Sequence, residues 1–565
     1  MKVKVITILI LLLIIGVIVW AKNSPREKFS QAKDFPNGAL VYLQSADLSE
    51  VIKLWQESKL KEKYLQSQNF QEFQTSHLGI KLAERRKDLN EAMGFQFDLQ
   101  VLSSLVEEQA AVAIYDIGKL DIVFIAPMKE TVFLATIFAQ NSQNFAENKL
   151  EDGTAFYLLE AEVDRQRQKQ KVIFSYFKGR FVLATSENLF LRTIAAIKGK
   201  QRLYDEIEFT KLSERITPNL ATIWVNQEKL NSDYYFKRYW LMSDVENLQN
   251  IRAGIFDLKL DDKGLTEKRE FLLKEAQNPE QISSQEAQNL LSQVPAHISF
   301  FRLQKIDEKQ LGEVIYNTFF DKQIVGKPNR NYSRNWSYID DKYYENDFYY
   351  LNSDFEKEIN EKDEEEVFET KSFSNSQISD AVNSAQPSAI LTASSPKTLE
   401  NPLFIEFRKI AIISLLNPKL FRPIDFENSI VEALKNRLTV ADAEFFWMTE
   451  NGLRKLQTPM LGWEISYQMI DGKLFITNSF ELLQECLSTK NKTEIEAKDF
   501  SDLTVIRLEN RKEIFDEVMA KLTENNSDFF TGNVAGLLDV MSDVQKNEIS
   551  RKAKDGFLSE EILVK

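Results

Sequence analysis

The chain opens with an apolar run that no later stretch matches. Residues 5–21 are almost all Val, Ile and Leu, with two lysines before them and Trp20 near their end. A membrane-spanning helix needs about 17–25 apolar residues, whereas a signal peptide has about 7–15 and small residues before its cleavage site. Residues 19–21 offer such a site, so a cleaved signal peptide is the alternative. We expect an uncleaved signal anchor over 1–21, because Trp20 lies where interfacial aromatic residues hold helices.

The charges beside this run predict where the rest of the chain lies. Lysines at the N-terminus favour a cytoplasmic start. A single-pass anchor in the cell membrane then leaves the bulk of the chain extracytoplasmic, which means periplasmic in a Gram-negative cell. Residues 5–21 would contact the membrane, and residues 22–34 would link the anchor to the folded part.

Beyond the linker, short apolar stretches alternate with segments of helical periodicity. Residues 39–43, 110–115 and 120–126 have the composition of strands, whereas 48–106 and 131–140 place apolar residues at helical spacing. Tight turns join many of the strands, and helices interrupt them at irregular places. The pattern therefore predicts the α+β class, with a mainly antiparallel sheet and packed helices.

The pattern also repeats within the chain. Residues 172–186 and 464–479 each have the pattern of a strand, a tight turn and a second strand. Gly179 and Gly472 are expected to supply the positive φ that such a turn requires. Two hairpins of the same design, so far apart in the sequence, indicate an internal duplication.

A helix start follows each hairpin at the same distance. Ser186 and Ser479 stand seven residues after the turn glycines, where a hydroxyl can accept a hydrogen bond from a free amide of the next helix. The helices are predicted over 189–197 and 482–487. This shared order of turn, strand and cap strengthens the duplication.

The separation between turn glycines is also nearly the same in the two halves of the chain. Two further hairpins have turn glycines at Gly264 and Gly556. The separation from Gly179 to Gly264 is 85 positions, and that from Gly472 to Gly556 is 84. Turn glycines are common, so coincidence is the alternative, but several landmarks match in order.

The landmarks predict two tandem related domains after the N-terminal membrane helix. Each domain opens with a proline-led strand, at Pro36 and at Pro295. The proline lies 143 positions before the turn glycine in the first copy and 177 in the second, so the second copy carries 34 extra residues. The predicted division is a first α+β repeat over 35–274, a connector over 275–293 and a second α+β repeat over 294–565.

The extra residues fall where the composition changes, over 327–401. From 340 to 369 there are thirteen Asp and Glu against three Lys. Such a segment cannot bury enough apolar surface to offset its lost chain entropy, so we expect a largely disordered acidic insertion. Its aromatic side chains offer a surface for a protein partner, or fold back on the protein's own sheet: Tyr332, Trp336, Tyr338, Tyr343, Tyr344, Tyr349 and Tyr350.

Several of these features together resemble a family of uncharacterised, mostly bacterial membrane-anchored proteins, the DUF3352 family. They are the N-terminal anchor, the proline-led first strand, the capped helix from Asp47 to Trp55, and the hairpin that ends in Thr185 and Ser186. The acidic insertion departs from the family pattern. The resemblance implies an architecture and an extracytoplasmic location, and it carries over no functional residue.

Composition removes several classes of function. A single cysteine excludes an intrachain disulfide framework and a thiolate-rich metal site. Two histidines exclude nearly every histidine-built metal centre within one chain. A net charge of −14 and a pI near 5.1 argue against nucleic acid as a partner.

No residue pattern singles out a catalytic, cofactor-binding or metal site, and we assign none. His297, expected on a strand over 296–301, is a candidate general base, but a hydrogen-bonded structural histidine is the commoner role. His77 is expected at an exposed helix end, and Cys486 on a buried helical face. The acidic residues near Asp340 offer oxygen ligands for Ca²⁺, but without the spacing of an EF-hand, so a solvated segment is expected there.

Three classes of function stay open. The leading expectation is a non-catalytic envelope protein that binds another protein or scaffolds an assembly. The alternative is a carrier or sensor of lipid-like molecules, because 40 phenylalanines are enough to line an apolar cavity as well as a core. The third is a hydrolase with a carboxylate-based site, which 85 acidic residues leave possible.

Overall fold

The computed structural model describes most of the chain in two compact units. Unit 1 comprises Met1–Lys61, Glu72–Asn278 and Ala553–Ile562, and unit 2 comprises Glu62–Gln71, Pro279–Lys552 and Leu563–Lys565. The expected anchor at 5–21 lies outside the described residues. Within the part of the chain that is described, no helix is long and apolar enough to cross a membrane. The described residues are 28–75, 77–106, 109–162, 169–233, 248–261, 264–276, 280–306, 310–320, 376–396, 407–438, 444–450, 452–457, 464–488, 499–507 and 544–565.

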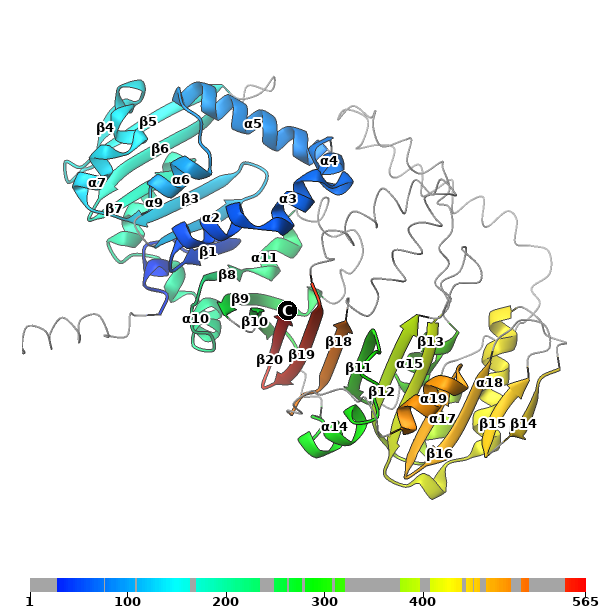
Figure 1. Cartoon of the computed structure of the whole chain (residues 1–565). Helices are drawn as coiled ribbons and strands as arrows, with labels where there is room; N and C mark the ends of the chain where they lie inside the picture. Colours follow the sequence, from blue (N-terminus) through cyan, green and yellow to red (C-terminus); the bar gives the residue numbers. More distant parts are fainter. Residues whose placement is uncertain are drawn as a thin grey trace, which may run out of the picture. The chain divides into compact units, whose positions relative to one another are not determined.

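Unit 1 is built on one antiparallel sheet (Figure 1). Its strands are β1 (Val41–Ser45), β2 (Ala110–Asp116), β3 (Asp121–Pro127), β4 (Ala146–Lys149), β5 (Ala155–Glu162), β6 (Lys169–Phe177), β7 (Arg180–Ala184), β8 (Ala221–Val225), β9 (Ile251–Asp261) and β10 (Gly264–Leu273). They lie in the order β4–β5–β6–β7–β3–β2–β1–β8–β9–β10, and every neighbouring pair is antiparallel.

The helical elements up to residue 278 fill the connections between these strands. They are η1 (Ser30–Lys33), α2 (Leu48–Glu57), α3 (Lys59–Gln66), α4 (Gln68–Thr75), α5 (His77–Met93), α6 (Leu99–Ser104), α7 (Glu130–Ala135), α8 (Ile137–Gln140), η2 (Ser142–Asn144), α9 (Glu187–Ile197), η3 (Leu203–Asp205), α10 (Ile207–Ser213) and α11 (Gln227–Ser232). Asp47 caps α2 by accepting a hydrogen bond from the Glu50 amide at 2.9 Å, as its position before the helix predicts.

Unit 2 is also built on one antiparallel sheet (Figure 1). Its strands are β11 (Phe300–Lys305), β12 (Pro387–Pro396), β13 (Phe407–Leu415), β14 (Phe446–Glu450), β15 (Leu453–Gln457), β16 (Ile465–Ile470), β17 (Lys473–Thr477), β18 (Asp502–Arg507) and β19 (Lys546–Lys554). Its helical elements are α14 (Ser284–Leu291), α15 (Leu311–Phe319), α17 (Ser376–Asn383), η4 (Pro418–Leu420), α18 (Pro423–Leu438) and α19 (Phe480–Leu487).

The strand order of unit 2 is that of the first nine strands in the order of unit 1, with ten added to each label. It runs β14–β15–β16–β17–β13–β12–β11–β18–β19, again with antiparallel neighbours. In both units the strand that comes first in the chain lies inside the sheet, and the strand that comes fourth lies at an edge. The predicted α+β class with a mainly antiparallel sheet is confirmed.

Each sheet is buried on both faces. In β3, Val123 and Ile125 pack into one apolar core, whereas Phe124 packs into another. In β13, Ile412 and Ile413 likewise belong to different cores. Helices cover both faces, because α9 and α10 contribute to the first core of unit 1 and α7 and α8 to the second. Burial on both faces explains why these strands are continuously apolar and do not alternate.

The predicted hairpin turns have the expected geometry. Gly179 and Gly472 adopt φ of 77° and 75°, and the residues before them, Lys178 and Asp471, adopt φ of 48° and 47°. Two successive positive φ values define the turn type that matches the twist of a two-residue hairpin. A side chain at either glycine would therefore strain the backbone.

The exits of the two hairpins are held by the same pattern of hydrogen bonds. The Thr185 hydroxyl accepts from the Ile122 amide at 2.7 Å and donates to the Leu120 carbonyl at 2.8 Å. The Asn478 side chain accepts from the Lys409 amide at 2.6 Å and donates to the Phe407 carbonyl at 2.9 Å. We call each arrangement an exit clamp, because it fastens the end of β7 or β17 to the start of β3 or β13.

The serine that follows each clamp starts a helix, as predicted. Ser186 accepts a hydrogen bond from the Leu189 amide at 3.4 Å, and Ser479 accepts one from the Leu482 amide at 3.3 Å. The helices α9 and α19 begin one residue after their caps. Clamp and cap together fix where the chain leaves the sheet.

The expectation of disorder over 327–401 is wrong for residues 376–396, which form α17 and β12. Ile390 and Leu391 are fully buried, and β12 pairs with both β11 and β13. The composition of β12 explains the wrong expectation of disorder. Ser, Thr and Ala dominate this strand, so it lacks the bulky β-branched residues of an interior strand. The rest of the expected insertion lies outside the described residues.

Two boundaries also differ from the expected division. Part of the expected linker at 22–34 is packed: η1 buries Ala32, Phe29 is 3% exposed, and Asp34 pairs with Arg180 at 2.6 Å. At the other end, residues 553–562 belong to unit 1, where the last strand, β20 (Phe557–Val564), extends the sheet beyond β10.

A buried carboxylate joins β20 to the rest of unit 1. Glu270 on β10 is only 3% exposed and accepts hydrogen bonds from Arg215 at 2.8 Å and from the Ser559 hydroxyl at 2.7 Å. The Arg215 guanidinium also stacks on the Phe557 ring, 4.2 Å from its centroid. The last strand of the chain is therefore tied to unit 1 by polar contacts as well as by pairing.

We predict that Glu270→Ala lowers the free energy of unfolding of unit 1 by about 2 kcal/mol, because Arg215 and Ser559 both lose their acceptor. Ser559→Ala is the matched milder change, with an expected loss of about 1 kcal/mol. Urea unfolding of the full chain, followed by hydrogen exchange of peptides from unit 1, measures both losses. Equal stability of Glu270→Ala and the parent chain would contradict the assignment.

Candidate functional site

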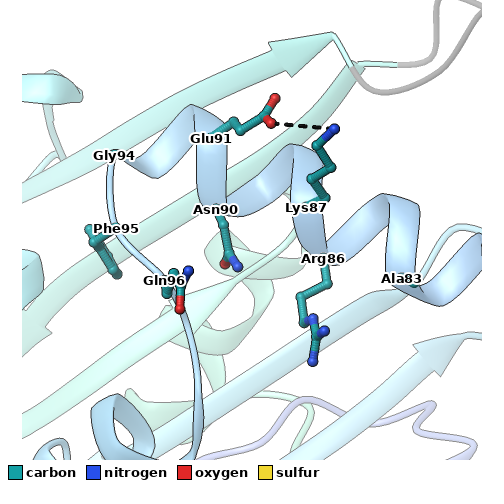
Figure 2. A pocket seen from close by; sticks show the side chains of 8 residues that line it. All are labelled: Ala83, Arg86, Lys87, Asn90, Glu91, Gly94, Phe95 and Gln96. Atoms are coloured by element: carbon teal, nitrogen blue, oxygen red, sulfur yellow. Dashed lines mark ion pairs between the residues drawn. The ribbon is translucent and has the colours of Figure 1, made fainter.

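An open groove of about 500 Å³ lies at the end of α5 (Figure 2). It forms where α5 stops: Gly94 adopts φ of 76°, and the Asn90 side chain accepts a hydrogen bond from the Phe97 amide at 2.9 Å. The chain thereby turns back beside the helix. The groove is lined by Ala83, Arg86, Lys87, Asn90, Glu91, Gly94, Phe95 and Gln96.

The chemistry of this groove is that of polar binding. Figure 2 shows the side chains of Lys87 and Glu91 on one side of α5 and those of Arg86 and Asn90 on the other. The Lys87–Glu91 pair is 3.7 Å apart, with side chains 73% and 67% exposed, so water screens it strongly. Arg86 has no ion-pair partner among the described residues. The groove thus offers a guanidinium to an anionic or polar ligand, and its lining contains no serine, threonine, cysteine or histidine.

A second polar cluster lies in unit 2, around His297. This residue does not lie on the strand expected over 296–301, because β11 begins only at Phe300. Its Nε2 atom is 3.0 Å from a carboxylate oxygen of Glu485 on α19, and Arg408 reaches the other oxygen at 3.3 Å. Arg408 also donates to the Ser395 hydroxyl at 3.3 Å.

These contacts do not place a nucleophile beside a base. The hydroxyl of Ser395 contacts Arg408, while His297 contacts the carboxylate beyond it. A hydrolytic triad needs the serine beside the imidazole. The cluster therefore fastens the segment before β11 to α19, which is the structural role that the sequence favoured for His297.

The other residues that the sequence singled out also have structural positions. Cys486 is 1% exposed in the core beneath α19, which confirms the expected burial of its thiol. His77 is the first residue of α5. The acidic residues near Asp340 lie outside the described residues. Among the residues that are described, no cluster of His, Cys, Asp and Glu has the arrangement of a metal site.

A charged network pins α18 to the sheet of unit 2. Glu427 accepts two hydrogen bonds from Arg454, both at 2.8 Å, and a third from the Tyr467 hydroxyl at 2.6 Å. Burial alone would raise the pKa of Glu427, but these hydrogen bonds and the Arg454 charge outweigh it and lower that pKa below its usual 4.5. Burial and the adjacent carboxylate raise the pKa of Tyr467. Trp447 on β14 completes the network by donating to the Glu427 carbonyl at 3.3 Å.

The two sheets differ most at one edge. In unit 1 the edge strand β4 has the sequence Ala-Glu-Asn-Lys and is fully polar on its exposed side chains apart from Ala146. In unit 2 the corresponding strand β14 exposes Phe446 and Met448, which are 59% and 41% accessible. Among the described residues β14 pairs with β15 alone, so its outer side is unpaired. Proteins usually place charged residues on such an edge to prevent association. The strand β4 has Glu147 and Lys149 there, whereas β14 has one charged residue, Glu450, at its end next to the turn.

No local sequence pattern marks the groove or the apolar edge. Nothing in residues 446–450 themselves shows that β14 ends the sheet. Pairing order is a long-range property. The alternation of Phe446 and Met448 is visible in the sequence. It indicates an exposed apolar face only once β14 is known to lie at the edge of the sheet.

No family model matches this chain, and no curated protein matches it. Two solved structures of TP0453 align with part of the chain. Crystal form I aligns at 11% identity over 45% of this chain and 82% of TP0453, with a TM-score of 0.24. Crystal form IV aligns at 9% identity over 43% and 79%, with a TM-score of 0.25. Likeness at this level carries no argument about fold or function.

We predict that Glu427→Gln destabilises unit 2 at neutral pH by about 1–2 kcal/mol, because a neutral amide replaces a charge-assisted acceptor. A lowered pKa means that the carboxylate stabilises the fold above 4.5 and loses this effect as the pH falls through the lowered value. The difference from the parent chain should therefore shrink under acidic conditions. Unfolding of the full chain by urea at several pH values measures this.

Asp425→Asn is the matched control, because the Arg422–Asp425 pair is about half exposed on both sides. An exposed pair of this kind contributes little to stability, so we expect a change within about 0.5 kcal/mol. A loss for Glu427→Gln that stays constant across the pH range would contradict the charged role of Glu427.

Proposed function

We propose that this protein is a non-catalytic, membrane-tethered, extracytoplasmic protein that binds another protein. Residues 5–21 would hold it in the cell membrane, with the bulk of the chain outside. The observation that carries the binding role is the unpaired apolar edge strand β14. The groove at α5 is open and bordered by charged side chains, so it does not favour a carrier of acyl chains.

We also propose that the two units arose by tandem duplication, which would give the architecture expected from the DUF3352 resemblance. The common strand order supports this, as do the two hairpin turns with the same φ values. The strongest support is the exit clamp, because Thr185 and Asn478 differ in chemistry yet bind the same two backbone positions of the neighbouring strand. Descent from one module explains a shared geometry with changed side chains.

The partner proposed for β14 is an extended segment of another protein. Glu450 pairs with Leu453 across the two-residue connection between β14 and β15, and such a closing pair is hydrogen-bonded on the inner side. The backbone groups of Trp447 and Thr449 then point outward, because the pattern alternates. A partner strand would pair with these groups and place apolar side chains beside Phe446 and Met448.

Trp447 makes this edge rigid before any partner binds. Its ring packs edge-on against Tyr467 at 5.4 Å, and its indole nitrogen donates to the Glu427 carbonyl. An edge held in place loses little conformational entropy on binding, which raises the affinity for an added strand. The exposed apolar side chains lie on the other face of the same strand, where Phe446 is 59% exposed and Met448 is 41% exposed beside Gln457, whose amide donates to the Met448 sulfur at 3.1 Å.

The edge is tested by photo-crosslinking from a benzoylphenylalanine at position 446, in cells that produce the full chain. We expect one recurrent crosslinked protein from position 446 and none from position 147 on the polar edge β4. Met448→Lys in the same chain should reduce the yield about tenfold or more, because a lysine at an edge opposes strand addition. The fold should be unchanged, since Met448 is exposed.

The same crosslinked proteins from positions 446 and 147 would contradict the edge as a specific binding surface. A captured protein is then purified with the full chain and examined by hydrogen exchange. Strand addition predicts slowed exchange of the Trp447 and Thr449 amides on binding. Unchanged exchange at these two amides would overturn the proposed mode of binding.

The duplication predicts that the clamp residues are exchangeable. Thr185→Ala and Asn478→Ala should each cost about 1–2 kcal/mol, because a backbone amide and a carbonyl lose their partner. Thr185→Asn and Asn478→Thr should recover much of that loss, since each residue performs the same task in the other unit. Urea unfolding of the four full-length variants measures this, and an Asn at 185 as harmful as Ala would count against the correspondence.

A further inference from the structure

The most exposed apolar side chains of unit 2 outside the β14 edge lie close together in the sequence, after β13. Leu416, Leu420 and Ile424 are 68%, 56% and 72% exposed. They belong to the segment that runs from the end of β13 to the first turn of α18, which we call the apolar loop and define as residues 415–424. Exposure of a large apolar side chain to water does not stabilise the fold. Three such side chains within nine residues indicate a site of interaction.

The apolar loop is not a loosely held segment. The amides of Leu415, Leu416 and Asn417 donate to the carbonyls of Gly472, Gln386 and Ala385 at 3.0–3.1 Å. Phe421 packs against Phe426 at 5.6 Å and Tyr467 at 6.0 Å. The backbone that carries the three exposed side chains is therefore held in place by hydrogen bonds and by packing of Phe421.

Many backbone amides and carbonyls of this loop have hydrogen-bond partners within the protein and do not need water. Besides the three amides that bind neighbouring turns, the amides of Leu420 and Phe421 donate within the loop, to Asn417 and Pro418. Pro418 and Pro423 have no amide hydrogen to satisfy. The Leu420 carbonyl accepts from the Ser384 hydroxyl at 2.8 Å. Hydrocarbon tolerates a polypeptide only where its backbone groups are paired internally, and most of those in this loop are.

The composition of the loop also fits lipid better than protein. Its exposed apolar residues are all aliphatic, whereas protein-binding hot spots are rich in Trp, Tyr and Arg. Lys419 lies in the loop and Lys473 lies opposite Ser414 on the neighbouring strand, and neither has a carboxylate partner among the described residues. Arg422 is neutralised by Asp425 at 2.9 Å, while Asp380, whose carbonyl accepts from Arg422, and Asp471, which precedes Gly472, supply two nearby negative charges. The unpaired lysines favour an anionic headgroup layer.

The corresponding loop of unit 1 lacks these features. By strand order and register, β3 corresponds to β13, and the residue at the position of Leu416 is Lys129, followed by Glu130. A single Leu134 is exposed there. The fold thus does not require an apolar loop at this place, and unit 2 alone carries one.

We propose that the apolar loop of unit 2 inserts into a lipid surface, with Leu416, Leu420 and Ile424 among the acyl chains and Lys419 and Lys473 at the headgroups. This contact is separate from the protein-binding edge and from the anchor at 5–21. It would hold unit 2 against a membrane as a second, reversible attachment. Leu416, Leu420 and Ile424 supply the buried apolar surface, and the two lysines supply the attraction to anionic lipid.

The test places an environment-sensitive fluorophore at position 420 of the full chain through Leu420→Cys. The native Cys486 is buried, so labelling is directed to the new thiol. The labelled chain is reconstituted into vesicles of equal parts phosphatidylglycerol and phosphatidylcholine, with and without bromine on the acyl chains. We expect a blue-shifted emission and a loss of roughly half of it in brominated vesicles, as for a label below the headgroups.

The matched control is Lys129→Cys, labelled in the same way in the corresponding loop of unit 1. Its emission should not change between the two kinds of vesicle, although the same anchor holds the chain there. Leu416→Ser with Ile424→Ser, carrying the label at 420, should lose the quenching while its thermal unfolding matches that of the parent chain. Vesicles of phosphatidylcholine alone should give weaker quenching, because the lysines then have no anionic lipid.

Several results would overturn the proposal. Emission at 420 that is insensitive to bromine, in vesicles that retain the chain, would show that the loop stays in water. Equal quenching at 129 and 420 would show general proximity to the bilayer and no insertion of this loop. A blue shift in detergent that grows with protein concentration would identify a second copy of the chain as the occupant.

Discussion

The exit clamp is the interaction on which the rest of each unit depends. A hairpin buried on both faces has no solvent-facing side to set its place in the sheet, so its register must come from directional contacts. Thr185 in unit 1 and Asn478 in unit 2 supply them by binding both an amide and a carbonyl of the neighbouring strand. The helix cap follows at the next residue, which places α9 and α19 over the sheet. Two consecutive residues thus fix both the pairing of the hairpin with its neighbouring strand and the start of the helix.

The contacts beside the clamp involve different side chains in the two units, although the helix position that makes them is the same. Arg192 on α9 donates to the Asn37 carbonyl at 2.5 Å, beside Gly38. Glu485 occupies the same position on α19, six residues after the capping serine, and contacts His297. The segment before the first strand is thus fastened to the same helix in both units, by a cation in one and by an anion in the other. Geometry is retained where the core requires it, and charge is free to change.

The hairpins and helix caps of this fold could be predicted from the sequence, because each depends on a few neighbouring residues. Hairpins depend on two or three residues in sequence, so Gly179 and Gly472 could be assigned their positive φ directly. Caps are equally local, as Ser186 and Ser479 confirm. The strand β12 was missed because its burial comes from neighbours far away in the chain, while its own Ser, Thr and Ala residues resemble those of a linker. The groove at α5 and the edge β14 were missed for the same reason, since both are defined by which segments end beside one another.

The differences between the units lie at their peripheries, and this bears on how the protein works. Interior positions of β3 and β13 are equally apolar because any polar group there would need a partner. Edges and end loops carry no such constraint, so they can diverge at little cost to stability. Unit 1 has polar residues at both places, in β4 and, with Lys129, in the loop after β3. Unit 2 has apolar side chains at both, which weakens solubility without aiding the core. Such residues reduce solubility and do not stabilise the fold, which fits the proposal that unit 2 carries the surfaces for contacts outside the chain.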